Sequence, residues 1–531
     1  MASLSNNVPV TESVPPVEAP PELLRLEFRR NMGQISRHSI AFFAGTIFTM
    51  GVGYVVKIYV ARVLGAELLG IYALGMILVS LTQLMGCLGL NGAAGRYVAV
   101  YNATARYEDL RGFLTRSVAI VLLFNSALSI GLLFYGDWLA RHLYHAPDLG
   151  RFIPMFAALT VLGALNVYYC QVLAGFKDIT KRTVITNFVG TSLVSSLTIV
   201  LLALGTGMRG YLWAQIINSV VVVVLLVAVA WRLTPKAARF SRARLTPFDP
   251  GIKAFAAASL GMGAIDFLVS QADKVLLGLY LNPALVGIYV VASTLSALIP
   301  LILQSVNQIF APVIADLHAR KRTDVLQRLF QSLTKWVFGL SLPLAIVIIA
   351  FAPPLMRMFG SAFEAGWPVL VIGSAGQVVN CGVGSVGYLL LMSGNQKRLM
   401  KVQFVMVVVS LAMNITLIPV LGLVGAALAA AVVNVGGNVW NLFEVRKALH
   451  IFPYNRGYFV LAIPVTLSAA TVVCLRFWIG GTVRPWLAIL TAVGAAYLVF
   501  AGIALMFALD QDDRMIASSA WSQVRASLQR R

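Results

Sequence analysis

The chain alternates long apolar segments with short polar ones, and fourteen of the apolar segments are long enough to cross a bilayer. A hydrocarbon core of about 30 Å requires about 20 helical residues. In lipid an open chain satisfies its backbone groups only as a helix, so each segment is predicted to be a spanning helix. The predicted spans are 39–61, 70–95, 117–136, 152–175, 184–204, 210–231, 255–280, 287–311, 336–355, 366–393, 402–420, 423–443, 458–478 and 486–508.

One stretch of this pattern occurs twice. Residues 57–72, KIYVARVLGAELLGIY, return as KVLLGLYLNPALVGIY at 274–289, with six of 16 positions identical at an offset of 217. The Leu-Gly pairs at 204–205 and 421–422 show the same offset. These matches predict two six-helix repeats. Because each repeat has an even number of spans, the two have the same orientation and are related by an axis along the membrane normal.

The predicted fold class is therefore an all-α polytopic membrane protein with about 14 spans, namely two parallel-oriented six-helix repeats and two extra C-terminal helices. The predicted organisation is a disordered cytoplasmic tail with a juxtamembrane basic helix at 1–38, a first half at 39–233, a cytoplasmic linker at 234–254, a second half at 255–445, two extra spans at 446–508 and a cytoplasmic tail at 509–531.

The composition agrees with a membrane protein. Of 531 residues 59% are hydrophobic and 11% charged, whereas about a quarter of the residues of a soluble domain are charged. The four cysteines lie in apolar runs without CxxC or histidine spacing, so neither a disulfide framework nor a zinc site is predicted. The sequence has no GxxxxGK[ST] stretch, so it does not predict ATP hydrolysis by a P-loop. No cofactor or metal is expected.

The basic residues fall mainly on one side of the predicted topology. Of 41 Lys and Arg, 32 lie in segments on the side of the two termini and seven in the opposite loops, which leaves only Lys57 and Lys274 within spans. Cytoplasmic loops are enriched in basic residues, so both termini are predicted to be cytoplasmic. This distribution explains the net charge of +21 without a nucleic-acid partner.

The two lysines within spans are candidate substrate-binding residues. A charge at the bilayer centre costs about 2.5–3.5 kcal/mol on insertion scales, so its retention suggests a function. Lys57 and Lys274 occupy equivalent repeat positions, which would place them on opposite walls of one cavity, where they would bind a diphosphate. The alternative is that Lys57 extends to the outer interface together with Arg62, which is itself a candidate for binding the substrate.

Two acidic residues lie in the predicted seventh span. Asp266 and Asp273 are seven residues apart and therefore share one helix face. One hypothesis is that they bind a coupling proton or cation. The alternative is a structural ion pair with Lys57 of the other half.

Further candidates are polar residues near or within the spans. Arg96 ends the second span on the cytoplasmic side, where it would meet a substrate head group or act as an ordinary membrane anchor. Amide side chains would bind sugar hydroxyls or join helices to each other. The amides singled out are Gln83, Asn91, Asn166, Gln171, Gln304, Asn307, Gln308, Gln377, Asn380, Asn434, Asn438 and Asn441.

Three sequence features carry a family resemblance. They are Gly-Ile-Tyr at 70–72, GLNGAAGRYVAVY at 89–101, and ADKVLLGLYL followed by VGIY within 272–289. They resemble the polysaccharide-transporter branch of the multidrug, oligosaccharidyl-lipid and polysaccharide exporter superfamily, and the resemblance covers most of residues 39–445.

The resemblance implies a flippase of the bacterial inner membrane rather than an enzyme. Such a protein moves an undecaprenyl-diphosphate-linked oligosaccharide or polysaccharide precursor across the membrane by alternating access, in lipopolysaccharide or exopolysaccharide synthesis. The implied partners are the lipid-linked glycan, membrane lipids, and in a functional sense a glycan polymerase and a chain-length regulator.

Two alternatives to the flippase remain at this point. A multidrug or cation antiporter of the same superfamily would be favoured by acidic cavity residues in both halves. A membrane glycan polymerase or acyltransferase would be favoured by a large outer loop or by clustered His, Asp and Arg.

Overall fold

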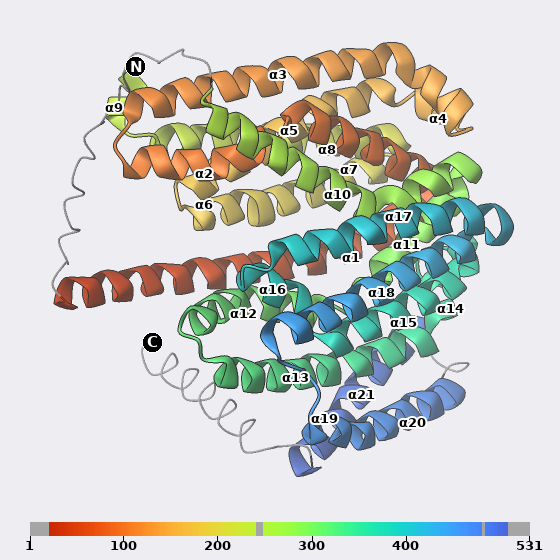
Figure 1. Ribbon diagram of the computed structural model, residues 1–531. Coiled ribbons are helices and arrows are strands. Elements are labelled where there is room, and N and C mark those ends of the chain that lie inside the picture. The colour runs from red at the N-terminus through yellow and green to blue at the C-terminus, as the bar shows by residue number, and fades with distance from the viewer. Residues whose placement is uncertain (1–20, 241–247, 480–483, 508–531) are drawn as a thin grey trace, which may run out of the picture.

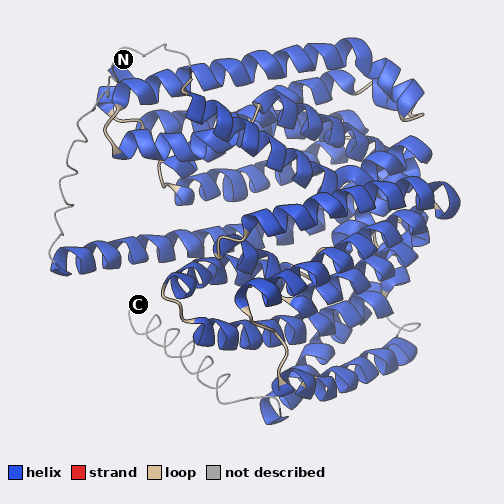
Figure 2. Ribbon diagram, viewed as in Figure 1, coloured by secondary structure: helices blue, strands red, loops and turns tan. Residues whose placement is uncertain are grey.

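The computed structural model describes residues 21–240, 248–479 and 484–507, which are helical almost throughout and contain no strand (Figures 1 and 2). The predicted all-α class is therefore confirmed. The predicted tail segments 1–20 and 509–531 and the linker residues 241–247 lie outside the described residues.

The elements before the linker are α1 (Pro21–Cys87), α2 (Leu90–Ala103), α3 (Tyr107–Trp138), η1 (Leu139–Leu143), α4 (Pro147–Gly150), α5 (Ile153–Gly175), α6 (Ile179–Thr183), η2 (Val184–Gly190), α7 (Thr191–Ala203), α8 (Gly207–Leu233) and α9 (Lys236–Phe240). After it come α10 (Pro250–Tyr280), α11 (Pro283–Ser296), α12 (Leu301–Ala319), α13 (Thr323–Ala350), α14 (Ala352–Arg357), η3 (Ser361–Gly366), α15 (Trp367–Val383), α16 (Val386–Met392), α17 (Gln396–Leu421) and α18 (Leu423–Leu449). The chain then forms α19 (Arg456–Val460), α20 (Ala462–Ile479) and α21 (Pro485–Phe507).

Eleven described helical segments are long and apolar enough to span a bilayer, or twelve if the pair α11 and α12, bent by 55°, is one span. The break between the two helices is residues 297–300 and ends at Pro300, the residue before α12. Residues 48–87 of α1 count as one segment, although they include most of two predicted spans. The predicted number of fourteen spans stays a prediction.

The repeated hairpin makes its turn differently in its two copies. In α1 the chain kinks at Gly65, whose φ of 78° lies in the left-handed region that favours glycine. In the second copy Asn282 stands at the same position, and its side chain accepts a hydrogen bond from the Leu285 amide (3.0 Å). Pro283 then opens α11 at a position where its missing N–H costs nothing.

The buried side chains form one shared core at one end of the bundle. This shared core includes residues on both sides of Gly65, Gly205 and Gly422, such as Val60 and Leu74 of α1 and Val291 of α11. We call this end the Gly65 face. It joins helices from both halves of the chain.

The opposite end of the bundle has two separate cores. One belongs to α2, α3, α5 and α8 and includes Tyr168, and the other belongs to α12, α13, α16 and α18 and includes Phe330. We call this end the linker face, because α8, α9 and the start of α10 meet there (Figure 1). The two halves therefore share a core at the Gly65 face and pack separately at the linker face.

Helices α1 and α11 hold the shared core together at a close crossing. A Cβ atom on Gly70 would lie 1.7 Å from the Pro283 carbonyl oxygen, and one on Gly287 would lie 2.1 Å from that of Ala66. Gly70 and Gly287 are the two glycines of the repeated Gly-Ile-Tyr sequence. Small residues allow spanning helices to approach at backbone distance, and these two positions therefore require glycine.

Helix α10 runs from the first half to the second (Figure 1). Near the linker face, Ile252 and Ala256 join the core of the first half, whereas Leu277 joins the shared core. The extra helices α20 and α21 pack beside α13, where the Tyr497 hydroxyl donates to the Leu340 carbonyl (2.8 Å).

Candidate functional site

The two lysines predicted to line opposite walls of one cavity lie on α1 and α10. Lys57 of α1 donates from Nζ to the Thr294 hydroxyl of α11 (2.7 Å), and the two ammonium groups repel each other. Lys274 of α10 donates to the Ser270 carbonyl (2.7 Å) and to Oε1 of Gln271 (3.0 Å). Both lysines are half-buried. The hydrogen bonds of both ammonium groups go to neutral oxygen atoms, and Lys274 also lies 4.0 Å from the Asp273 carboxylate.

Asp273 lies next to Lys274 but faces into the second half. Its Oδ2 accepts from the Tyr289 hydroxyl (2.6 Å), and its Oδ1 accepts from the Lys274 amide (2.8 Å). The carboxylate lies 4.0 Å from the Lys274 ammonium. Asp266 is exposed, and among the described residues no ion pair joins Lys57 to either aspartate. The alternative of an ion pair between the halves therefore has no support in the described part of the chain.

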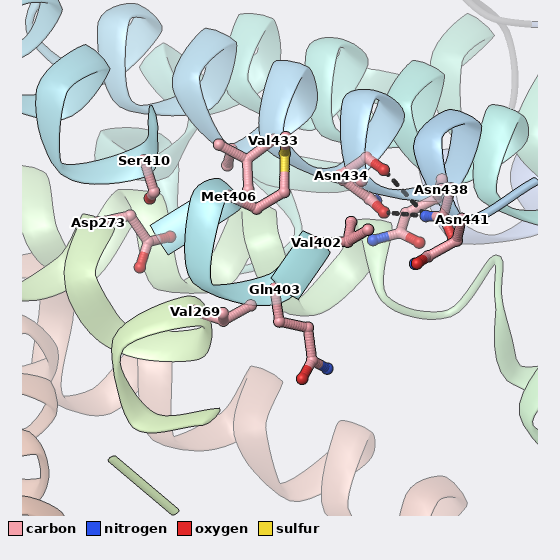
Figure 3. A pocket seen from close by; sticks show the side chains of 13 residues that line it. Val269, Asp273, Val402, Gln403, Met406, Ser410, Val433, Asn434, Asn438 and Asn441 are labelled. Atoms are coloured by element: carbon pink, nitrogen blue, oxygen red, sulfur yellow. Dashed lines mark hydrogen bonds between the residues drawn. The ribbon is translucent and has the colours of Figure 1, made fainter. Parts of the chain in front are cut away.

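A cavity of about 350 Å³ opens beside Asp273, between α10, α15, α17 and α18 (Figure 3). Its polar lining is mainly amide, and within it Nδ2 of Asn438 donates to Oδ1 of Asn434 (2.7 Å). The buried Oδ1 of Asn441 has no hydrogen-bond partner among the described residues. We call this space the amide cavity. Its lining residues are Val269, Asp273, Gln377, Val402, Gln403, Met406, Ser410, Ala430, Val433, Asn434, Gly437, Asn438 and Asn441.

The two predicted arginines lie outside the amide cavity. Arg62 is exposed beside the Gly65 kink, and its Nε donates to the Met358 carbonyl of the second half (2.7 Å). Arg96 is exposed on α2, with its guanidinium 4.8 Å from the ring centroid of Phe255 and 5.7 Å from that of Tyr97. Arg62 therefore bridges the halves, and Arg96 packs where α10 begins.

Three predicted amide residues also lie apart from the cavity. Gln83 donates from Nε2 to the Leu159 carbonyl (3.3 Å), which joins two helices of the first half. Asn91 is half-buried in the first turn of α2. Asn307 of α12 is 8% exposed, and its Oδ1 has no partner among the described residues.

Sequence reasoning missed two residues of this region. The Thr294 hydroxyl accepts a hydrogen bond from the Lys57 ammonium, and the Thr294 carbonyl accepts one from the Tyr54 hydroxyl (2.8 Å). Gln403 lines the amide cavity from α17. Gln403 stands in an otherwise apolar run, which is a signal that was available in the sequence, whereas Thr294 has no such signal.

A bundle of apolar helices long enough to span a bilayer, in which two halves share a core at one end, fits a multi-pass membrane protein of the transporter class. The chain belongs to the polysaccharide biosynthesis protein family, whose profile matches residues 59–366. Within the described part of the chain, no cluster of His, Cys, Asp and Glu could hold a metal ion.

Proteins of similar sequence or structure belong to the same class. The probable flippase AglR of Haloferax volcanii is 25% identical over 435 residues, which are 80% of this chain and 86% of AglR. The structure of the lipid II flippase MurJ in an inward closed conformation aligns with a TM-score of 0.68 at 14% identity, over 88% of this chain and 98% of MurJ.

An inward-facing multidrug transporter of the MATE family has the same fold, with a TM-score of 0.62 at 14% identity over 78% of this chain and 98% of the transporter. These relatives are flippases and transporters and not enzymes. Since flippases and drug transporters share the fold, the fold alone does not identify the substrate.

Proposed function

We propose that this protein is a flippase that moves a lipid-linked oligosaccharide or polysaccharide precursor, carried on undecaprenyl diphosphate, across the membrane. The observation that carries the proposal is the pair of repeat-related lysines, of which Lys274 adjoins Asp273 of the amide cavity, in a chain of the polysaccharide biosynthesis family. Two ammonium groups match the charge of a diphosphate. Amide groups both donate and accept hydrogen bonds, as sugar hydroxyls require.

In this proposal the substrate enters from the linker face, where the halves pack separately. The Arg96 guanidinium lies at the start of α10 and meets the diphosphate first. The diphosphate then binds Lys57 and Lys274, the first sugars occupy the amide cavity, and the lipid tail stays in the bilayer. Asn91 and Asn307 provide further hydrogen bonds along this route.

Lys57 couples binding to opening of the Gly65 face. Its ammonium bonds to Thr294 of the second half, so this contact is one of those that join the halves. A diphosphate offers Lys57 a charged acceptor, and a hydrogen bond between two charged groups is stronger than one to a neutral hydroxyl. Exchange of Thr294 for the diphosphate therefore weakens the closed end when substrate is bound.

Asp273, with Asp266 nearer the linker face, is proposed to bind the coupling proton or cation. The observations in favour are that Asp273 lines the amide cavity and lies beside Lys274. A cation bound there would then change both the charge of the cavity and the field at the lysine.

The 32-to-7 distribution of basic residues supports a cytoplasmic linker face and cytoplasmic termini. The proposed location is the bacterial inner membrane, and the proposed functional partners are a glycan polymerase and a chain-length regulator. The segment 234–254 serves as the linker between the two six-helix halves.

The test is transport of a lipid-linked oligosaccharide by purified protein in proteoliposomes. Lys57→Ala and Lys274→Ala are each expected to reduce the initial rate by about tenfold or more, because each removes a charged contact to the diphosphate that is worth about 1.5–3 kcal/mol. Lys253→Ala, an exposed lysine at the start of the same helix α10, is the matched control and is expected to keep the wild-type rate. Wild-type rates in both site variants would refute the proposal.

A further inference from the structure

A second cavity lies in the first half, at the linker face, where α3, α5, α8 and α9 meet. Its volume is about 310 Å³, and ligand pockets span about 300–1,000 Å³. Its lining residues are Arg111, Leu114, Thr115, Val118, Tyr169, Val172, Val227, Ala230, Trp231, Thr234, Ala238 and Arg239. None of the proposed substrate residues is among them.

The lining includes two arginine side chains and no carboxylate. Arg111 donates from Nη1 to the Arg239 carbonyl (2.7 Å). Arg239 donates from Nε to the Thr234 carbonyl (2.8 Å) and from Nη2 to the Arg232 carbonyl (2.6 Å). These bonds fix both side chains in half-buried positions, and the carbonyls that accept them carry no net charge. The lining is therefore cationic and preorganised, which favours an anion.

The rest of the lining fits an amphiphile at the membrane surface. Leu114, Val118 and Val227 form an apolar wall. Trp231 is 59% exposed, and the Arg239 guanidinium lies 5.7 Å from its ring centroid. Tryptophan is enriched at the boundary between lipid and water, so the arginines are at the level of lipid head groups.

We propose that this cavity binds the phosphate head group of an anionic phospholipid from the leaflet at the linker face. Basic pockets between spanning helices on the cytoplasmic side are suited to such head groups. The bound lipid bridges α3 and α9 and so stabilises the start of the segment that leads to the second half. This site is separate from the path of the glycan substrate.

The test is native mass spectrometry of the full-length protein after delipidation, with phosphatidylglycerol or phosphatidylcholine of identical acyl chains added back. The wild type is expected to retain phosphatidylglycerol preferentially. Arg111→Gln is expected to weaken that binding by about fivefold, the effect of about one basic residue near an anionic head group. Arg116→Gln, on the same helix but outside the lining, is expected to bind as the wild type does.

Arg111→Gln also removes a contact to α9, so a second variant tests the cavity with both arginines retained. Val118→Trp fills the cavity without a change of charge, and it is expected to lose phosphatidylglycerol to the same extent as Arg111→Gln. Equal binding of both phospholipids, or wild-type binding by both cavity variants, would overturn the proposal. Polyprenyl phosphate and inorganic phosphate are added in separate measurements. Binding of only one of these two, without phosphatidylglycerol, would also overturn the proposal.

Discussion

Thr294 shows how one neutral side chain keeps a charge inside the bundle. Its hydroxyl accepts from the Lys57 ammonium and itself donates to the Val290 carbonyl (2.6 Å). The second bond orients the hydroxyl so that its lone pair faces the lysine. A single threonine therefore determines where the ammonium group of the first half lies when no substrate is bound.

Thr294→Val is expected to destabilise the protein by about 1.5–3 kcal/mol, the usual contribution of a hydrogen bond to a charged group. The measurement is thermal unfolding in detergent without substrate. Thr294→Ser retains the hydroxyl and is the control, with a stability close to that of the wild type. If the valine and serine variants unfold at the same temperature, the contact between Lys57 and Thr294 does not hold the halves together.

Asp273 and Asp266 are expected to differ in function although both lie on α10. Asp273→Asn keeps the shape of the side chain and removes its charge next to the amide cavity. Transport driven by an ion gradient is expected to fall by about tenfold or more, within the usual range of coupling between two sites. Asp266 is exposed, so Asp266→Asn is expected to have the smaller effect. Unchanged gradient dependence in Asp273→Asn would exclude this carboxylate as the coupling site.

The element that organises the molecule is the repeated hairpin, whose two copies cross each other at the Gly65 face. The crossing of α1 and α11 depends on Gly70 and Gly287, which allow contact between the helix backbones. The same copies carry Lys57 and Lys274. Lys57 therefore lies on a crossing helix, whereas Lys274 lies on α10, the helix before the crossing helix α11.

Gly70→Ala is expected to weaken this crossing, because its added methyl group would overlap the Pro283 carbonyl. Overpacking of this kind costs about 1–3 kcal/mol, which is measured as a loss of thermal stability. Gly131→Ala is the matched control, since no atom lies within 4 Å of the added Cβ on α3. Equal stability of the two variants would show that the crossing tolerates a side chain.

The all-α class could be predicted from sequence, because the length of each apolar segment is a local signal, and the second copy of the hairpin could be found because the sequence match survives at an offset of 217 residues. The repeat predicted Lys57 and Lys274 on opposite walls of one cavity, which stays a prediction. Asn434, Asn438 and Asn441, singled out by their helical spacing, line the amide cavity. The spacing of Asp266 and Asp273 predicted a shared helix face, yet only Asp273 lines the amide cavity. The reason is that α10 passes from one half to the other, so a single helix face meets different neighbours along its length.

Other features depend on tertiary contacts and gave no sequence signal. Thr294 becomes important only through the register in which α11 crosses α1. Lys335 comes directly before the predicted span 336–355 and was therefore counted among the loop residues, yet it is 2% exposed within α13. A basic residue near a predicted helix end looks the same in sequence whether it faces water or the protein interior.

At the scale of the whole molecule, the packing is asymmetric between its two ends. The shared core joins the halves at the Gly65 face, and separate cores stabilise each half at the linker face. An alternating-access cycle requires the shared core to separate while the separate cores stay intact. Contacts such as that between Tyr54 and the Thr294 carbonyl (2.8 Å) must then break once in each cycle.

The most direct test is to cross-link the halves and measure flipping of a lipid-linked oligosaccharide in proteoliposomes. A short reducible thiol linker between Tyr54→Cys and Thr294→Cys is expected to stop transport, and reduction is expected to restore it. The same linker between Leu340→Cys and Tyr497→Cys, which joins α13 to α21, is expected to leave transport unchanged. Continued flipping with the first pair cross-linked would contradict transport by separation of the two halves.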